Sequence, residues 1–242
     1  MPADGRPKPI PRWRFLKACE AGDVDCVRKY VETADHRAYL QDDSALNSAV
    51  YYDHPEILTI LLEAGTDPNI HGEHVSALHV AAANDNVEAA AILISHGAKI
   101  DVRDKVNNDT ALIYGIRDGK FGVAQVLLEA GADPHLTDRR GFTPLHIAVA
   151  RDDTKIVQCL LDHGAAINVR THSDGRTPLM IAAAAGFEEM VELLLSRGAD
   201  PSIVDTGGKS PLERAVECHR SGVADILRKA SPSRKASLAG KK

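Results

Sequence analysis

A short pattern recurs along the chain at a nearly constant spacing. Each copy has a serine or threonine, then alanine or proline, then a leucine and, three residues later, a small residue. The six copies begin at Ser44, Ser76, Thr110, Thr143, Thr177 and Ser210, with steps of 32, 34, 33, 34 and 33 residues. A period of this length is typical of proteins built from stacked supersecondary units. The repeat therefore constrains the fold more than any single residue does.

A second signal in the same register marks the end of each unit. A pair of large aliphatic residues follows the Ser/Thr by seventeen and eighteen positions, and a glycine comes soon after. The pairs are Leu61-Leu62, Leu93-Ile94, Leu127-Leu128, Leu160-Leu161 and Leu194-Leu195, and the glycines are Gly65, Gly97, Gly131, Gly164 and Gly198. We expect two short helices in each unit. The Ser/Thr would cap the first helix, and the left-handed glycine would end the second.

The position two residues before each Ser/Thr predicts a tight turn between units. It holds Asp42, His74, Asn108, Gly141, Gly175 and Gly208. These residue types tolerate positive φ better than most. In three copies, proline follows the cap, at the first helical position, where it loses no hydrogen bond. The leucine and the small residue of each copy share one helix face, and the small residue lets a neighbouring helix approach closely.

The period, caps, leucine pairs and glycines together resemble the ankyrin repeat family over nearly the whole chain. A degenerate further copy, FLKACEAGDVDCVRKYV, precedes the six and has Trp13 at the cap position. The resemblance implies an all-α ankyrin-repeat solenoid of stacked helix-turn-helix units with projecting β-hairpin-like turns. Terminal repeats are expected to be atypical, because one of their faces has no neighbour. We therefore count seven repeats, of which two are caps.

This count sets the predicted domain organisation. Residues 1–12 are expected to be a disordered N-terminal segment, residues 13–230 the ankyrin repeat domain, and residues 231–242 a disordered basic tail. The repeats are predicted at approximately 13–41, 42–71, 72–104, 105–138, 139–171, 172–204 and 205–230. The repeats occupy most of the 242 residues, so we expect no separate catalytic domain.

Composition excludes several function classes. A net charge of −5 gives no global electrostatic case for binding nucleic acid or an anionic membrane. The four cysteines lack disulfide-framework and zinc spacings, which favours free thiols in a reducing compartment. No apolar run approaches the roughly 20 residues of a membrane span. We expect a cytoplasmic protein, with the nucleus as a further compartment that the sequence leaves open, and we expect a monomer.

His146, in the stretch GFTPLHIAVA, is the residue that most resembles a catalytic group. The same offset in the six units holds Asn47, His79, Ile113, His146, Met180 and Glu213. A catalytic role is not expected at a position that accepts isoleucine and methionine. In repeats that resemble these, the histidine braces the cap and adjacent turns. Because motifs for zinc hydrolysis, phosphate binding and serine nucleophiles are also lacking, we predict no enzyme, no catalytic residue, no cofactor and no metal.

The function is expected to lie on the surface. Proteins that resemble this one bind partner proteins through the concave face formed by turn tips and first helices. Because tyrosine and arginine dominate many interfaces, we predict contacts by eight residues. They are Tyr51, Tyr52, Arg117, Arg139, Arg140, Phe142, Arg151 and Phe187. The predicted role is an adaptor, inhibitor or assembly chaperone for another protein. An unrecognised enzyme, a regulatory subunit of one and a nucleic-acid binder are the alternatives.

Two further features leave questions open. Five arginines, Arg117, Arg139, Arg140, Arg151 and Arg176, favour an acidic partner segment, but the neighbouring Asp118, Asp152 and Asp153 weaken that inference. In the tail, RKASL resembles a site for basophilic kinases and makes Ser237 a candidate phosphorylation site. Family resemblance also implies hydroxylation of turn asparagines such as Asn69 and Asn168.

Overall fold

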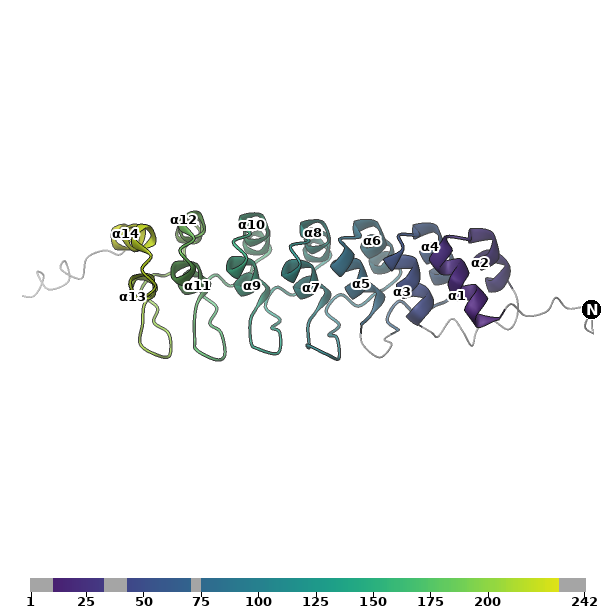
Figure 1. Ribbon diagram of the computed structural model, residues 1–242, viewed down its shortest axis with the longest axis horizontal. Helices are drawn as coiled ribbons and strands as arrows, with labels where there is room; N and C mark the ends of the chain where they lie inside the picture. Colours follow the sequence, from purple (N-terminus) through teal and green to yellow (C-terminus); the bar gives the residue numbers. More distant parts are fainter. Residues whose placement is uncertain (1–10, 33–42, 71–74, 231–242) are drawn as a thin grey trace, which may run out of the picture. The chain divides into compact units, whose positions relative to one another are not determined.

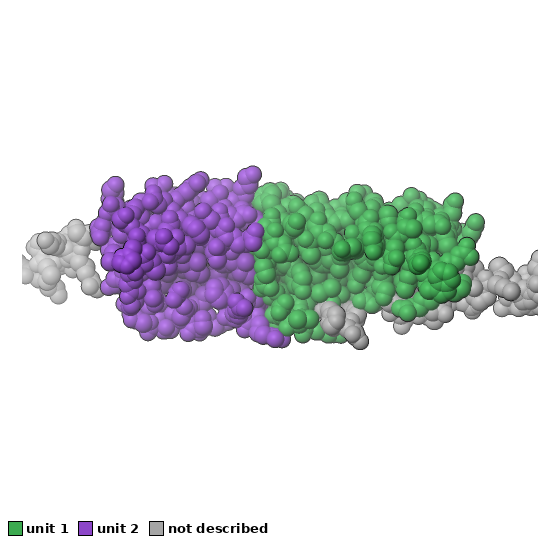
Figure 2. All heavy atoms as spheres, in the orientation of Figure 1, with its two compact units in different colours: residues 1–132 green, residues 133–242 purple. Residues whose placement is uncertain are grey.

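The computed structural model describes residues 11–32, 43–70 and 75–230. The chain divides into two compact units, residues 1–132 and residues 133–242 (Figure 2). All regular elements of the described residues are α-helices, apart from one isolated bridge between Arg103 and Thr110. The prediction of an all-α chain is confirmed. The predicted segment 231–242 and residues 1–10 lie outside the described residues.

The described residues of unit 1 form four pairs of short helices. They are α1 (Arg12–Ala21) with α2 (Val24–Val31), α3 (Asp43–Tyr51) with α4 (Pro55–Glu63), α5 (Ala77–Asn84) with α6 (Val87–Ser95), and α7 (Ala111–Arg117) with α8 (Phe121–Glu129). Along the stack, α3 packs on α5 and α5 on α7, while α4 packs on α6 and α6 on α8. The apolar face of each pair is thus buried against the next pair.

Residues 133–230 of unit 2 repeat this plan with three pairs. They are α9 (Pro144–Ala150) with α10 (Thr154–Asp162), α11 (Pro178–Ala185) with α12 (Glu188–Ser196), and α13 (Pro211–Glu217) with α14 (Ser221–Ala230). Figure 1 shows α9, α11 and α13 in one row and α10, α12 and α14 in a second, with the connecting turns projecting from the first row. The core of each unit consists mainly of leucine, isoleucine, valine and alanine.

Most of the predicted caps are confirmed. Thr110, Thr177 and Ser210 are N-caps whose hydroxyl oxygens accept a hydrogen bond from the backbone N–H three residues later. Ser44 is an exception, because α3 already begins at Asp43, an acidic residue that suits the first turn of a helix. Trp13 is another: it lies inside α1, which follows Pro11, and an indole has no oxygen that could cap a helix.

Positive φ angles mark three turns of the repeat, two of which the sequence predicted. The five glycines after the second helices and four of the six inter-unit positions, Asn108, Gly141, Gly175 and Gly208, have φ between 61° and 95°. Asp42 and His74 lie outside the described residues. The third turn joins the two helices of a repeat, nine residues after the Ser/Thr. It holds Asp53, Asp85, Gly119, Asp152, Gly186 and His219, and sequence reasoning missed it.

Candidate functional site

The inter-repeat turns are built around an inward-pointing acid. Asp138 is 9% exposed, and one of its carboxylate oxygens accepts hydrogen bonds from the N–H groups of Arg140 and Phe142, each at 2.9 Å. The N–H of Asp138 donates to the Phe142 carbonyl at 3.0 Å, which closes a β-hairpin-like turn. The projecting turns predicted from the sequence are thereby confirmed, but their anchoring acid was not anticipated.

Two other turns use an acid at nearly the same place. Asp104 precedes its cap by six residues and accepts hydrogen bonds from Val106, Asn107 and Asp109; Asp205 precedes its cap by five and accepts them from Gly207 and Lys209. Burial raises the pKa of the Asp104 carboxyl, but these backbone donors outweigh it and leave the pKa below its ordinary value. A recurring aspartate five or six residues before the Ser/Thr was the sequence signal for this anchor.

Histidines fasten one turn to the next. Nδ1 of His146 accepts a hydrogen bond from the Thr143 N–H at 3.2 Å, and Nε2 lies 3.2 Å from the carbonyl oxygen of Arg176, in the following turn. His79 bridges Ser76 to the Asp109 carbonyl in the same way, at 2.8 and 3.1 Å. Since Nδ1 of His146 is an acceptor, Nε2 carries the proton and donates. The predicted bracing role of His146 is confirmed.

Burial keeps this imidazole neutral. The side chain of His146 is fully buried, and desolvation lowers its pKa despite the opposing effect of the hydrogen bond to Arg176. A neutral imidazole with both nitrogens engaged has no role left as an acid or base. The residue therefore belongs to the scaffold.

Asparagines make a second set of ties, beyond the second helices. Nδ2 of Asn69 donates to the Gly97 carbonyl at 3.1 Å, and its Oδ1 accepts from the Lys99 N–H at 2.7 Å. Asn168 likewise accepts from the Asp200 N–H at 2.9 Å. In unit 2, the repeats of α9 and α11 are thus joined at both ends, and in unit 1 such ties link the repeats of α3, α5 and α7 in sequence.

In unit 1, two of the three predicted contact residues, Tyr51 and Tyr52, are exposed, whereas the third, Arg117, is engaged in an ion pair. Tyr51 and Tyr52, at the end of α3, are 63% and 48% exposed, and their rings meet edge to face at 5.1 Å. A shallow depression of about 370 Å³ beside Tyr51 is lined by the turns of two successive repeats. Arg117, in contrast, forms an ion pair with the fully buried carboxylate of Asp109. Arg117 is therefore a structural residue as well as a surface residue.

In unit 2, the other five lie at two ends of the first helices. Arg139 and Arg140 are exposed on the turn before α9, and Phe142 is half-buried there with its ring edge-on to His146 at 5.8 Å. Arg151 is the exposed C-cap of α9, and Phe187 is the half-buried N-cap of α12. The turn group and the helix-end group are separate surfaces.

Sequence reasoning missed a third group, four residues after each cap. These side chains stay half-buried, and four of the six have buried neighbours on both sides. They are Ser48, Val80 and Tyr114 in unit 1 and Ile147, Ile181 and Arg214 in unit 2. They share a helix face with the residues eight after the cap, such as Tyr52 and Arg151. The sequence signal was an offset of the first helix that holds apolar, aromatic and polar residues in different repeats.

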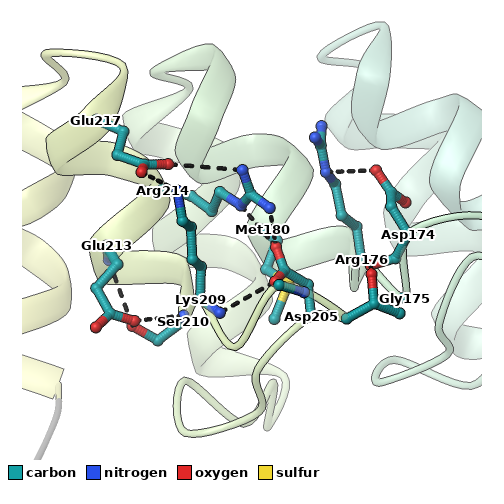
Figure 3. Close-up of polar contacts among 12 residues, drawn as sticks. Asp174, Gly175, Arg176, Met180, Asp205, Lys209, Ser210, Glu213, Arg214 and Glu217 are labelled. Carbon is teal, nitrogen blue, oxygen red and sulfur yellow. Dashed lines mark hydrogen bonds and ion pairs between the residues drawn. The ribbon is translucent and has the colours of Figure 1, made fainter.

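In the last repeat, Arg214 occupies the position four residues after the cap. Its Nε donates to the buried carboxylate of Asp205 at 2.6 Å, and its guanidinium also lies 3.5 Å from Glu217 (Figure 3). Ser210 and Glu213 form a capping box, in which the Glu213 carboxylate accepts from the Ser210 N–H at 2.7 Å. An ion-pair network thus replaces the apolar contact at this offset.

Within residues 11–32, 43–70 and 75–230, no three His, Cys, Asp or Glu side chains are grouped closely enough to hold a metal ion. None of the helices in these ranges is long and apolar enough to cross a membrane. Ser237, the candidate phosphorylation site, lies outside the described residues.

Sequence relatives match only in part. Over 177 residues, 71% of this chain, it is 41% identical to an ankyrin repeat protein of fowlpox virus, and that alignment covers 24% of the viral protein. Protein PhlB of Serratia liquefaciens is 42% identical over 104 residues, which is 43% of this chain and 46% of PhlB. The chain thus spans less than half the length of either relative.

The fold and the family agree. The crystal structure of the ankyrin repeat domain of Bcl-3, a member of the IkappaB protein family, matches 88% of this chain and 97% of that chain, with a TM-score of 0.80 and 28% identity. A profile for three copies of the ankyrin repeat matches residues 71–138, 112–205 and 171–236, and the single-repeat profile matches residues 41–73. The predicted all-α ankyrin-repeat fold is confirmed, and the chain belongs to the ankyrin repeat family.

Proposed function

We propose that this chain is a non-catalytic module that binds a protein partner through the exposed face of its first helices, as an adaptor, inhibitor or assembly chaperone. The observation that carries the proposal is the regular series of half-exposed side chains four residues after each cap, flanked by exposed residues eight after it. In unit 1 this face presents Tyr52, Val80 and Tyr114, and in unit 2 it presents Ile147, Arg151 and Ile181. Apolar and aromatic anchors with arginine beside them are typical of protein interfaces.

Rigidity supports the same proposal. The turns are held by Asp104, Asp138 and Asp205 from within, and histidines and asparagines tie successive repeats together. A surface that is already ordered loses little conformational entropy on binding. Each unit therefore offers its side chains at fixed spacing to a partner of matching shape.

The distribution of titratable groups disfavours the enzyme alternative. Several described groups with shifted pKa values, including His146, Asp104 and Asp205, are engaged in turns and caps. An active site instead brings such groups together in one pocket. The proposed compartment is the cytoplasm, from the spacing of the cysteines, and the proposed state is a monomer.

Affinity capture with the intact protein tests the proposal. The bait is used on extract of its native cells, and captured proteins are identified by mass spectrometry. The triple variant Tyr51→Ala, Tyr52→Ala and Arg151→Ala should lose the specific partner while keeping its helical circular dichroism. The matched control, Lys155→Ala with Glu192→Ala, changes exposed residues of the second helices and should retain it. Equal capture by both variants would reject this face.

A further inference from the structure

The first turn of unit 2 carries positive charge outside and negative charge inside. Arg139 and Arg140 are exposed, and neither guanidinium has an ion-pair partner among the described residues. Asp138, the acid inside this β-hairpin-like turn, is 9% exposed. Its carboxylate accepts hydrogen bonds from the N–H groups of Arg140 and Phe142. The sequence places the charges side by side, but the fold separates them.

The second turn of unit 2 lies against the first and adds to the same charge. Gly141 lies so close to the His172 ring that a methyl group on its α-carbon would clash with Nδ1 of that ring. Arg170 is exposed and fixed by its Nε, which donates to the Gly175 carbonyl at 3.1 Å. The acid of this turn, Asp174, is paired with Arg176 at 2.7 Å (Figure 3). Three guanidiniums, of Arg139, Arg140 and Arg170, therefore remain uncompensated by an ion pair among the described residues.

The aspartates that weakened this inference in the sequence lie elsewhere. Asp152 and Asp153 follow α9, whereas Arg139 and Arg140 precede it. The Asp153 carboxylate also accepts from the Ile156 N–H at 3.0 Å, as the cap of α10. Asp153 is therefore engaged at the start of α10.

The third turn of unit 2 has a net charge closer to zero and marks the end of the basic surface formed by the first two turns. Its acid, Asp205, is paired with Arg214, and Lys209 is paired with Glu217. Glu213 and Glu217 both lie on α13, next to this turn. The basic patch is thus confined to residues 138–142 and 170–176.

We propose that this basic patch, Arg139, Arg140 and Arg170 on two contacting turns, binds an acidic segment of the protein partner. The inference rests on the proposed function and specifies the chemistry of one contact with the partner, an ionic contact between arginine and carboxylate side chains. A guanidinium binds a carboxylate through two parallel hydrogen bonds, and three of them on braced turns suit a short run of Asp or Glu. Tight nucleic-acid binders neutralise about 6–10 phosphates, more than three guanidiniums supply.

Fluorescence anisotropy with a labelled twelve-residue glutamate-rich peptide tests this contact on the full-length chain. The charge-reversal variant Arg139→Glu with Arg140→Glu should weaken binding about tenfold or more, because like charges then face the peptide. The matched control, Lys155→Glu with Lys229→Glu, makes the same change of net charge at exposed positions of α10 and α14 and should stay within about twofold of the wild type. Circular dichroism confirms that both variants fold.

Three results would overturn the inference. They are equal weakening in both variants, unchanged binding in the turn variant, and tighter binding of a twelve-nucleotide single strand than of the peptide. The proposed function is judged separately, by capture with the Tyr51, Tyr52 and Arg151 variant. If that variant loses the partner but replacement of Arg139 and Arg140 does not change peptide binding, the proposed function is supported and only the inference of an acidic contact is rejected.

Discussion

Arg117 and Asp109 form an ion pair that spans one helix, from the residue before its N-cap to its last turn. The Asp109 carboxylate is fully buried, and the Arg117 side chain is 42% exposed. Lys209 and Glu217 repeat the relationship in unit 2 with the charges exchanged, again eight residues apart. In these two repeats the residue before the cap is therefore a neighbour of the residue seven after it. This geometry gives Arg117 a structural role that its sequence position does not reveal.

Replacing Arg117 should destabilise the protein. The variant Arg117→Ala leaves a buried carboxylate without its cation, so we expect the free energy of unfolding to fall by about 1–3 kcal/mol. Urea unfolding followed by circular dichroism measures the loss. Arg140→Ala removes an exposed arginine and should change stability by less than about 0.5 kcal/mol. A neutral effect of Arg117→Ala would show that the pair contributes little.

His146 should be important for stability and tolerant of one specific replacement. His146→Ala removes the bridge between Thr143 and the Arg176 carbonyl and leaves a cavity, for an expected loss of about 2–4 kcal/mol. His146→Met should cost less, because Met180 fills the same offset of the next repeat and is fully buried. The comparison is made by chemical unfolding. A methionine variant as unstable as the alanine variant would contradict it.

The same residue should make stability depend on pH. Because burial lowers the pKa of His146 in the folded chain, the unfolded chain binds a proton first as the pH falls through 6.5. The stabilising contribution is complete above that pH and is lost below it. Urea midpoints at pH 7.5 and 5.5 should therefore differ more in the wild type than in His146→Met. An identical difference in both proteins would mean that His146 titrates normally.

Repeating features of the sequence were sufficient to predict the fold. The Ser/Thr caps, the glycines and the aliphatic pairs act within a few residues of where they stand, so their local effects could be predicted without coordinates. A single aspartate does not by itself indicate positive φ, so the turn at Asp53, Asp85 and Asp152 is revealed only by alignment with Gly119 and Gly186. Inspection of that offset across repeats would have found it.

The candidate surface was less predictable, since it depends on which charges satisfy one another in space. Arg117 and Arg139 look equivalent in the sequence, yet the first is paired with Asp109 and the second is exposed on a turn. Such pairing links residues on opposite ends of a helix or in adjacent repeats. Sequence offset alone does not specify it.

The buried pair of Asp205 and Arg214 should contribute more than an exposed pair of the same chemistry. Asp205→Asn keeps an oxygen for the Gly207 and Lys209 N–H groups but removes the charge that Arg214 faces. We expect a loss of about 1–3 kcal/mol and faster hydrogen exchange in α13. Asp225→Asn breaks the exposed pair with Arg228 and should cost less than about 0.5 kcal/mol. Equal losses would show that burial adds nothing.

Asp152 should be replaceable by glycine with a gain in stability. Its φ is 58°, which is unfavourable for a residue with a side chain. Burial together with the charge of Glu189 raises the pKa of its carboxyl, so the environment also disfavours the carboxylate. Glycine occupies this offset at Gly119 and Gly186. We expect Asp152→Gly to raise the free energy of unfolding by about 0.5–1 kcal/mol, measured by urea unfolding at neutral pH.

Asp53 provides the matched control for this substitution. It has nearly the same φ, 59°, but its carboxylate accepts a hydrogen bond from Asn86 at 2.9 Å. Asp53→Gly relieves the same backbone strain and loses that bond, so its net effect should be close to zero or destabilising. Stabilisation of both variants to the same extent would mean that the hydrogen bond is unimportant. Destabilisation of both would mean that aspartate is at no disadvantage in this turn.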